Sequence, residues 1–124
     1  MFGKTYHNLN VIEVSKVRLI QNYRDLAKKY HMPVAPVLKS NAYGHNAVLV
    51  AKILEQEAPP FICVDSLYEA YQLLKARIKS QILIMGFTPA ENLGVKPLPF
   101  AYAVYTTEMI DAIKKYQPQA PIHI

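Results

Sequence analysis

The residues with the clearest chemical potential gather at Lys39, directly after an apolar run. Residues 34–38 favour a β-strand, and a turn of small, polar and aromatic residues that contains Gly44 follows at once. A lysine at the end of a buried strand has difficulty reaching bulk water, and an apolar setting favours its neutral amine over the charged ammonium. A neutral ε-amine is the form that attacks an aldehyde to make a Schiff base. We therefore predict that Lys39 is the central functional residue.

The elements that must position Lys39 alternate between strand-like and helix-like patterns. Apolar runs predict strands at 10–14, 34–38, 61–64, 81–85, 101–105 and 122–124. Apolar residues at three- and four-residue spacing predict helices that begin near residues 15, 47, 66 and 107. The prolines between 89 and 99 restrict any helix there to a short or irregular one. Apolar strands separated by helices are typical of βαβ units with a parallel sheet.

Two of the predicted helices carry capping signals at their starts. Ser66 and Glu69 have the spacing of a capping box, in which each side chain accepts a hydrogen bond from the other residue's amide. Thr107 is expected to cap the last helix, because acidic residues follow in its first turn and Lys114 and Lys115 lie in its last turn.

Consecutive βαβ units along the whole chain indicate either a (β/α)8 barrel or a doubly wound sheet. The chain has four glycines and none in G-x-G spacing, so it lacks a dinucleotide-binding fingerprint and the barrel is favoured. A complete barrel takes roughly 200 residues or more. We therefore predict an α/β fold over residues 1–124: a partial (β/α)8 TIM-type barrel, counted from Val34 and truncated at about the start of its fifth strand. Lys39 then lies at the C-terminal end of a barrel strand, where such barrels hold their active sites.

The composition of the chain indicates which kinds of partner and which cellular compartment to expect. Hydrophobic residues make up 52% of the chain and charged residues 19%, as in an ordinary globular domain. The net charge of +5 is scattered, so we expect no nucleic-acid partner, although a small anionic ligand is compatible. Cys63 is expected to be a core residue in a reducing compartment. Because the chain has no signal-peptide pattern and no run near ~20 apolar residues, we expect a cytoplasmic protein without a membrane partner, and we assign no metal-ligating residue.

The segment 37–45, Val-Leu-Lys-Ser-Asn-Ala-Tyr-Gly-His, closely resembles the pyridoxal-phosphate attachment motif of alanine racemases. In that family a strand ends in Val-Lys-Ala-Asn-Ala-Tyr-Gly-His-Gly. Ser40 stands where alanine is usual and Asn46 where glycine is usual, and asparagine tolerates positive φ better than most residues. The resemblance covers the whole chain but only the first third or so of a typical family member. Flanking segments that agree with the family in order and spacing are 11–14, 64–70, 82–86 and 122–124.

This resemblance implies roles for individual residues of the motif. Lys39 would form the Schiff base with pyridoxal 5'-phosphate and then act as one of two acid–base groups at the substrate Cα. Tyr43 would donate its hydroxyl to the cofactor phosphate. Asn41 and Gly44 are expected to shape the turn, and His45 is expected to be a hydrogen-bonded structural residue.

The resemblance also implies a pyridoxal-phosphate-dependent isomerase: a homodimer that converts L-alanine to D-alanine for cell-wall peptidoglycan. The family's C-terminal β domain, which supplies the second acid–base group as a tyrosine from the other subunit, has no counterpart in residues 1–124. The alternative is a truncated, non-catalytic cofactor-binding or interaction fragment that associates through an exposed strand edge. A different amino-acid substrate stays open. Pyridoxal-phosphate homeostasis proteins and decarboxylases of the same fold rank lower, because their motifs lack the Asn-Ala-Tyr-Gly-His continuation.

Overall fold

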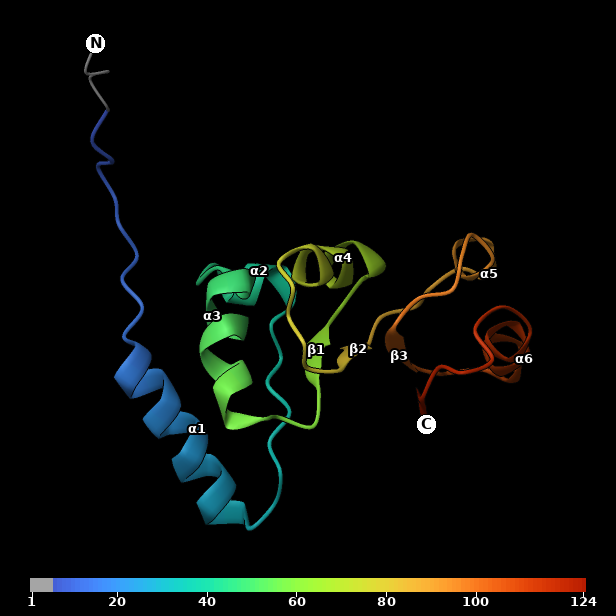
Figure 1. Cartoon of the computed structure of the whole chain (residues 1–124), viewed down its shortest axis with the longest axis horizontal. Coiled ribbons are helices and arrows are strands. Elements are labelled where there is room, and N and C mark those ends of the chain that lie inside the picture. The colour runs from blue at the N-terminus through green and yellow to red at the C-terminus, as the bar shows by residue number, and fades with distance from the viewer. Residues whose placement is uncertain (1–5) are drawn as a thin grey trace.

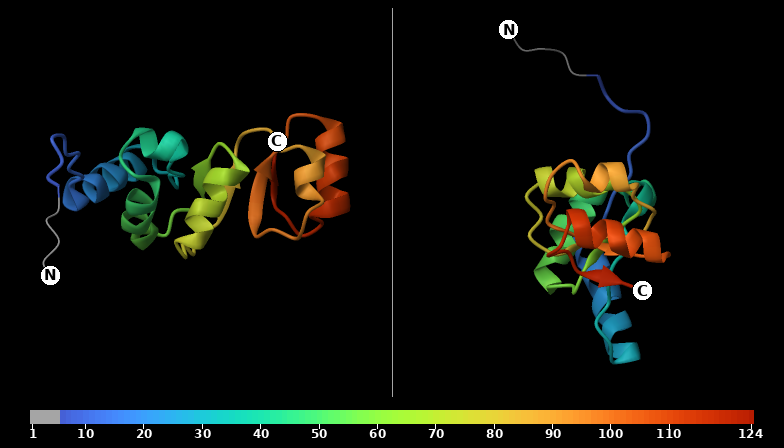
Figure 2. Two further views of the ribbon diagram at one scale, coloured as in Figure 1. Left: turned by 90° about the horizontal axis from the view of Figure 1, so that it is seen from above. Right: turned by 90° about the vertical axis from the view of Figure 1, so that its right-hand side faces the viewer.

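In the computed structural model, which describes residues 6–124, four parallel strands form one sheet in the order β1-β2-β3-β4. Figures 1 and 2 show the elements following one another along the long axis of the molecule, from α1 at one end to α6 at the other. The strands are β1 (Ile62–Val64), β2 (Ile82–Ile84), β3 (Phe100–Ala103) and β4 (Ile122–His123). The helices are α1 (Lys16–Tyr30), α2 (Lys39–Tyr43), α3 (Ala47–Leu54), the 3-10 turn η1 (Glu55–Glu57), α4 (Leu67–Lys75), α5 (Ala90–Leu93) and α6 (Thr107–Tyr116).

The sheet is apolar on both faces, as the uninterrupted apolar runs predict. Side chains on one face join the helices in the main core; they are Ile62, Val64, Ile82, Ile84, Phe100 and Tyr102. On the opposite face Cys63, Leu83 and Ala101 form a second buried cluster, with Phe61 and Met85 packed against it. Strand register places these three residues side by side. In a closed barrel this second face is the interior, so the architecture is the predicted partial barrel.

The segment that carries Lys39 borders β1 as a single bridge rather than a full strand. Val37 pairs with Cys63 in parallel, and the Leu38 amide donates to the Cys63 carbonyl at 2.8 Å. The Cys63 amide in turn donates to the Pro36 carbonyl at 2.9 Å. The prediction of a strand over 34–38 was therefore right in position but too long. Pro36 has no amide of its own to extend the ladder.

The predicted strand at 10–14 was wrong. These residues form no strand, and Val11 and Ile12 are 71% and 67% exposed. No described strand lies beside them to complete a ladder, and an isolated strand has no hydrogen-bond partner.

The helix starts predicted at Ser15 and Ser66 are confirmed, and the start of the last helix is shifted by one residue. The side chains of Ser15 and Ser66 accept from the amides of Arg18 at 3.4 Å and Glu69 at 3.3 Å. The last helix is capped by Thr106 rather than Thr107, because Thr106 has the extended backbone that a cap requires and accepts from the Met109 amide at 3.2 Å. The proline-rich segment holds only the four-residue α5. Along the described chain, no helix combines the length and apolar character needed to cross a membrane.

Candidate functional site

The turn that follows the bridged segment is left-handed. Ser40, Asn41, Ala42 and Tyr43 have φ values of 52°, 55°, 53° and 52°. L-residues disfavour this conformation by roughly 1–2 kcal/mol each, because the Cβ approaches the next carbonyl oxygen. After Lys39, the other four residues of α2 form one left-handed helical turn, and Gly44 ends it at φ 88°. The turn therefore stores strain that neighbouring contacts must offset.

Hydrogen bonds within the motif hold this turn closed. The Ala42 amide donates to the Leu38 carbonyl at 2.8 Å, and the Gly44 amide donates to the Ser40 carbonyl at 3.2 Å. The Asn41 side chain accepts from the Ala47 amide at 2.9 Å, which ties the turn to the first residue of α3. The prediction that Asn41 and Gly44 shape the turn is confirmed.

His45 and Asn46 complete the junction with α3. His45 Nδ1 lies 3.0 Å from the Ala42 carbonyl oxygen, so the ring donates to the turn when this nitrogen carries a proton. This contact is in line with the hydrogen bond predicted for His45. Asn46 has a φ of 71° and its side chain accepts from the Leu49 amide at 3.1 Å. Asparagine thus serves both as the helix cap and as a residue that tolerates positive φ.

Glu69, in the first turn of α4, connects the turn to the neighbouring strand. One carboxylate oxygen accepts from the Ser40 amide at 2.6 Å, and the other accepts from the Asp65 amide at 2.8 Å. Only half of the predicted capping box therefore forms: Ser66 caps the Glu69 amide, but the Glu69 carboxylate binds Asp65 and Ser40. The capping-box spacing indicated an acid at a helix start. The spacing did not indicate that the turn after Lys39 lies within hydrogen-bonding distance of Glu69.

Lys39 directly precedes the left-handed residues of α2, and Tyr43 is the last of them. Lys39 is half-buried rather than fully buried, and Tyr43 is 62% exposed. Lys39 follows the segment paired with β1, so it lies at the carboxyl end of the parallel sheet. Gly86 follows β2 at the same end and donates to the Asp65 carbonyl. The one ion pair among residues 6–124 joins Arg24 to Glu57 elsewhere, which leaves the Lys39 amine outside any ion pair in that range.

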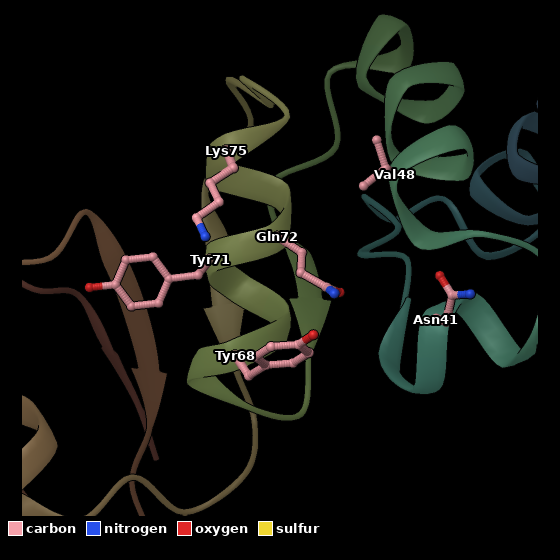
Figure 3. Close-up of a pocket in the computed structure, with 6 residues that line it drawn as sticks. All are labelled: Asn41, Val48, Tyr68, Tyr71, Gln72 and Lys75. Atoms are coloured by element: carbon pink, nitrogen blue, oxygen red, sulfur yellow. The ribbon is translucent and has the colours of Figure 1, made fainter.

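Two cavities lie near the turn. One, of about 440 Å³, separates α4 from α3 on the helical side of the sheet; in Figure 3, Tyr68 and Gln72 point across it toward Asn41 and Val48. Asn41 of the turn lines it, but neither Lys39 nor Tyr43 does. A second cavity of about 210 Å³ lies behind the turn, and its lining consists of Val14, Leu19, Val37, Leu38, Ala42, His45 and Val50. Within the described residues, no cluster of histidine, cysteine, aspartate and glutamate is placed to hold a metal ion.

Comparison with known proteins adds independent information. Residues 14–124 match the family model described as "Alanine racemase, N-terminal domain". The chain is 30% identical over 120 residues to alanine racemase 2 of Caldanaerobacter subterraneus subsp. tengcongensis, covering 91% of this chain and 31% of that relative. It is 52% identical over 59 residues to alanine racemase of Streptococcus suis, covering 48% of this chain and 16% of that protein.

Solved structures agree with these sequence matches. Alanine racemase of Clostridium difficile 630 superposes with a TM-score of 0.77 at 28% identity, covering 88% of this chain and 30% of that one. The fold also matches alanine racemase of Oenococcus oeni, with a TM-score of 0.79 at 23% identity. The chain thus spans about a third of the length of the relatives it matches most broadly. From the family match and the shared barrel architecture, we conclude that this chain belongs to the alanine racemase family and corresponds to its N-terminal part.

Proposed function

We propose that this chain supplies the cofactor-binding lysine of a pyridoxal-phosphate-dependent enzyme that interconverts L- and D-alanine. The observation that carries the proposal is the placement of Lys39: half-buried, at the carboxyl end of a parallel barrel sheet, and at the start of a left-handed turn. Membership of the alanine racemase family supports the same reaction. D-Alanine made in the cytoplasm would supply peptidoglycan synthesis.

The residues present fit pyridoxal phosphate by their chemistry. The primary amine of Lys39 suits an aldehyde, and Tyr43, an exposed residue, carries a hydroxyl that can donate to a phosphate. When bound, this cofactor supplies an electron sink for the pair left at an amino acid's Cα. Lys39 would hold the cofactor and, once freed by the substrate, take or return the Cα proton on one face. Tyr43 would fix the orientation of the phosphate end.

Racemisation requires proton transfer on both faces of Cα, and Lys39 serves only one of them. We propose that residues 1–124 act as the N-terminal portion of the barrel domain. The second acid–base group would come from a C-terminal β domain of the other subunit in a homodimer. In this arrangement the chain contributes the lysine side of a shared active site.

Covalent capture of the cofactor tests the role of Lys39. The 124-residue chain is incubated with pyridoxal 5'-phosphate, reduced with borohydride and digested for peptide mass measurement. We expect a pyridoxyl group on Lys39, and we expect the Lys39→Ala variant to lose that modification. Lys52→Ala is the matched control, because Lys52 is an exposed lysine on the neighbouring helix α3. A chain that is modified equally at its surface lysines and not preferentially at Lys39 would contradict the proposal.

A second candidate function is non-catalytic binding of the cofactor or of a protein partner. The observation that favours it is β4, whose residue Ile122 is 40% exposed although it lies in the sheet. An open sheet edge is a template for pairing with another chain. Measuring the exchange of L- and D-alanine by the 124-residue chain separates the two candidates. Turnover that disappears in Lys39→Ala supports the enzyme, whereas cofactor capture without turnover, together with self-association in sedimentation, supports the binding role.

A further inference from the structure

We infer that Glu69 is the positioning residue of the site: its carboxylate holds the left-handed turn that orients Lys39. This inference rests on the proposed function of Lys39 as the cofactor lysine. The two carboxylate oxygens of Glu69 accept from the amides of Ser40, at 2.6 Å, and Asp65, at 2.8 Å. Ser40 directly follows Lys39, and Asp65 directly follows β1. One side chain thus joins the carboxyl ends of two adjacent barrel segments.

Glu69 is the one side chain from beyond residues 37–46 that forms a hydrogen bond to this turn in the described structure. The other bonds that reach this segment from outside it are made by backbone groups, those of Ala47, Leu49 and Cys63 among them. Backbone bonds attach the start of the turn to β1, because the Leu38 amide donates to the Cys63 carbonyl and the Leu38 carbonyl accepts from the Ala42 amide. The bond from Ser40 to Glu69 adds a side-chain attachment directly after Lys39, and it links the turn to α4.

Because the turn is strained, the hydrogen bond from Ser40 to Glu69 matters for keeping its conformation. Ser40 has a φ of 52°, a conformation that serine leaves readily for negative φ when nothing holds it. Hydrogen bonds from amides to an ionised carboxylate are among the strong ones, and the start of α4 favours the negative charge on Glu69. No ion pair joins Glu69 to Lys39, so the influence of Glu69 on the amine passes through the Ser40 backbone.

The chain offers a matched control for this arrangement. Glu55 is also half-buried, and its carboxylate also accepts from two successive loop amides, those of Lys79 and Ser80, the second at 3.0 Å. These amides precede β2, so Glu55 acts at the amino end of the sheet, away from Lys39. Both amides donate to one oxygen of Glu55, so Glu55→Gln removes the charge but keeps an acceptor there, without touching the turn.

The test compares Glu69→Gln, Glu69→Asp and Glu55→Gln in the 124-residue chain. Glutamine replaces one acceptor oxygen by an NH2 group that cannot accept from a backbone amide. We expect Glu69→Gln to speed hydrogen exchange at the Ser40 amide and to slow pyridoxal-phosphate capture at Lys39 by about tenfold. Glu69→Asp, which keeps the charge on a shorter side chain, should be intermediate. Glu55→Gln, which likewise removes a charge from a half-buried acceptor of two amides, should leave both readouts unchanged.

The outcomes distinguish this inference from the proposed function. If the unmodified chain captures no cofactor at Lys39, the proposed function fails, and Ser40 exchange still decides the role of Glu69. If Ser40 exchange is the same in Glu69→Gln and in the unmodified chain, the inference is overturned. Equal losses of capture in Glu69→Gln and Glu55→Gln would also overturn it, because general destabilisation would then explain the effect.

Discussion

Gly86 and Asp65 lie in direct backbone contact at the carboxyl ends of β2 and β1. The Gly86 amide donates to the Asp65 carbonyl at 2.9 Å. A Cβ built on Gly86 would lie 2.1 Å from that same carbonyl oxygen, far inside van der Waals contact. Glycine at this position therefore lets the loops after two barrel strands approach each other beside the residue, Asp65, that Glu69 also holds.

Gly86→Ala is expected to destabilise the fold by about 3 kcal/mol, because the added methyl group must displace backbone rather than a flexible side chain. Urea unfolding followed by circular dichroism measures the change. Gly44→Ala serves as the contrast: its Cβ would meet no atom within 4 Å, but its φ is 88°. The stability of that variant should fall only by the conformational cost of a side chain at this φ, about 1 kcal/mol. Similar losses of stability in Gly86→Ala and Gly44→Ala would show that the close backbone contact at Gly86 adds no cost of its own.

Much of the fold follows from local patterns. The strands around Cys63 and Leu83 could be predicted because a sheet covered on both faces needs apolar residues at every position. Helix starts were predicted to within one residue. Thr106 and Thr107 both carry a side chain able to cap, and only the extended backbone of Thr106 decides between them. The strand expected at 10–14 failed because strand formation depends on a neighbour that the local sequence does not specify.

The sequence names candidate residues for the site, but it did not predict the geometry of the turn that carries them. The resemblance pointed to Lys39 and Tyr43, yet four successive left-handed residues contradict the local preference of serine and alanine. Tertiary contacts override that preference, and the contact from Glu69 comes from 29 residues along the chain. A capping-box pattern describes only the helix to which it belongs. It cannot report a hydrogen bond to a turn on another segment.

Asn41→Ala is expected to destabilise the chain by about 1–2 kcal/mol. The variant removes the oxygen that accepts from the Ala47 amide at 2.9 Å, and alanine tolerates a φ of 55° less well than asparagine. Thermal unfolding gives the size of the loss. Asn41→Asp keeps an acceptor oxygen at the start of α3 and should retain most of the stability. An Asn41→Asp variant as unstable as Asn41→Ala would show that the acceptor is not what matters.

The contact between α1 and η1 is expected to weaken in acid. Arg24 donates two hydrogen bonds to the Glu57 carboxylate, at 2.8 and 2.9 Å, and this bonding lowers the pKa of Glu57 below its ordinary value of 4.5. A lowered folded-state pKa means that the contribution to stability is present above pH 4.5 and is lost as the pH falls through the folded-state pKa. Stability measured against pH for the unmodified chain and for Glu57→Gln should differ at neutral pH and converge in acid. A difference that persists at the lowest pH would contradict the ion pair as its source.

Tyr102→Phe is expected to leave the fold as stable as before or to stabilise it by about 1 kcal/mol. The Tyr102 ring is fully buried in the core, and its hydroxyl has no hydrogen-bond partner among the described residues. Removing an unsatisfied buried hydroxyl relieves a desolvation cost while the ring keeps its packing.

The same residue should govern behaviour at high pH. Burial, with a smaller contribution from Tyr71, raises the pKa of Tyr102 from 10.0 to about 12. The neutral phenol is therefore favoured in the folded chain, and stability is fully present below pH 10 and falls as the pH rises toward 12. Alkaline unfolding should be less steep in Tyr102→Phe than in the unmodified chain. Tyr68→Phe, which alters an exposed tyrosine on α4, should leave the alkaline transition unchanged. An identical transition in all three proteins would show that the Tyr102 phenol does not control alkaline stability.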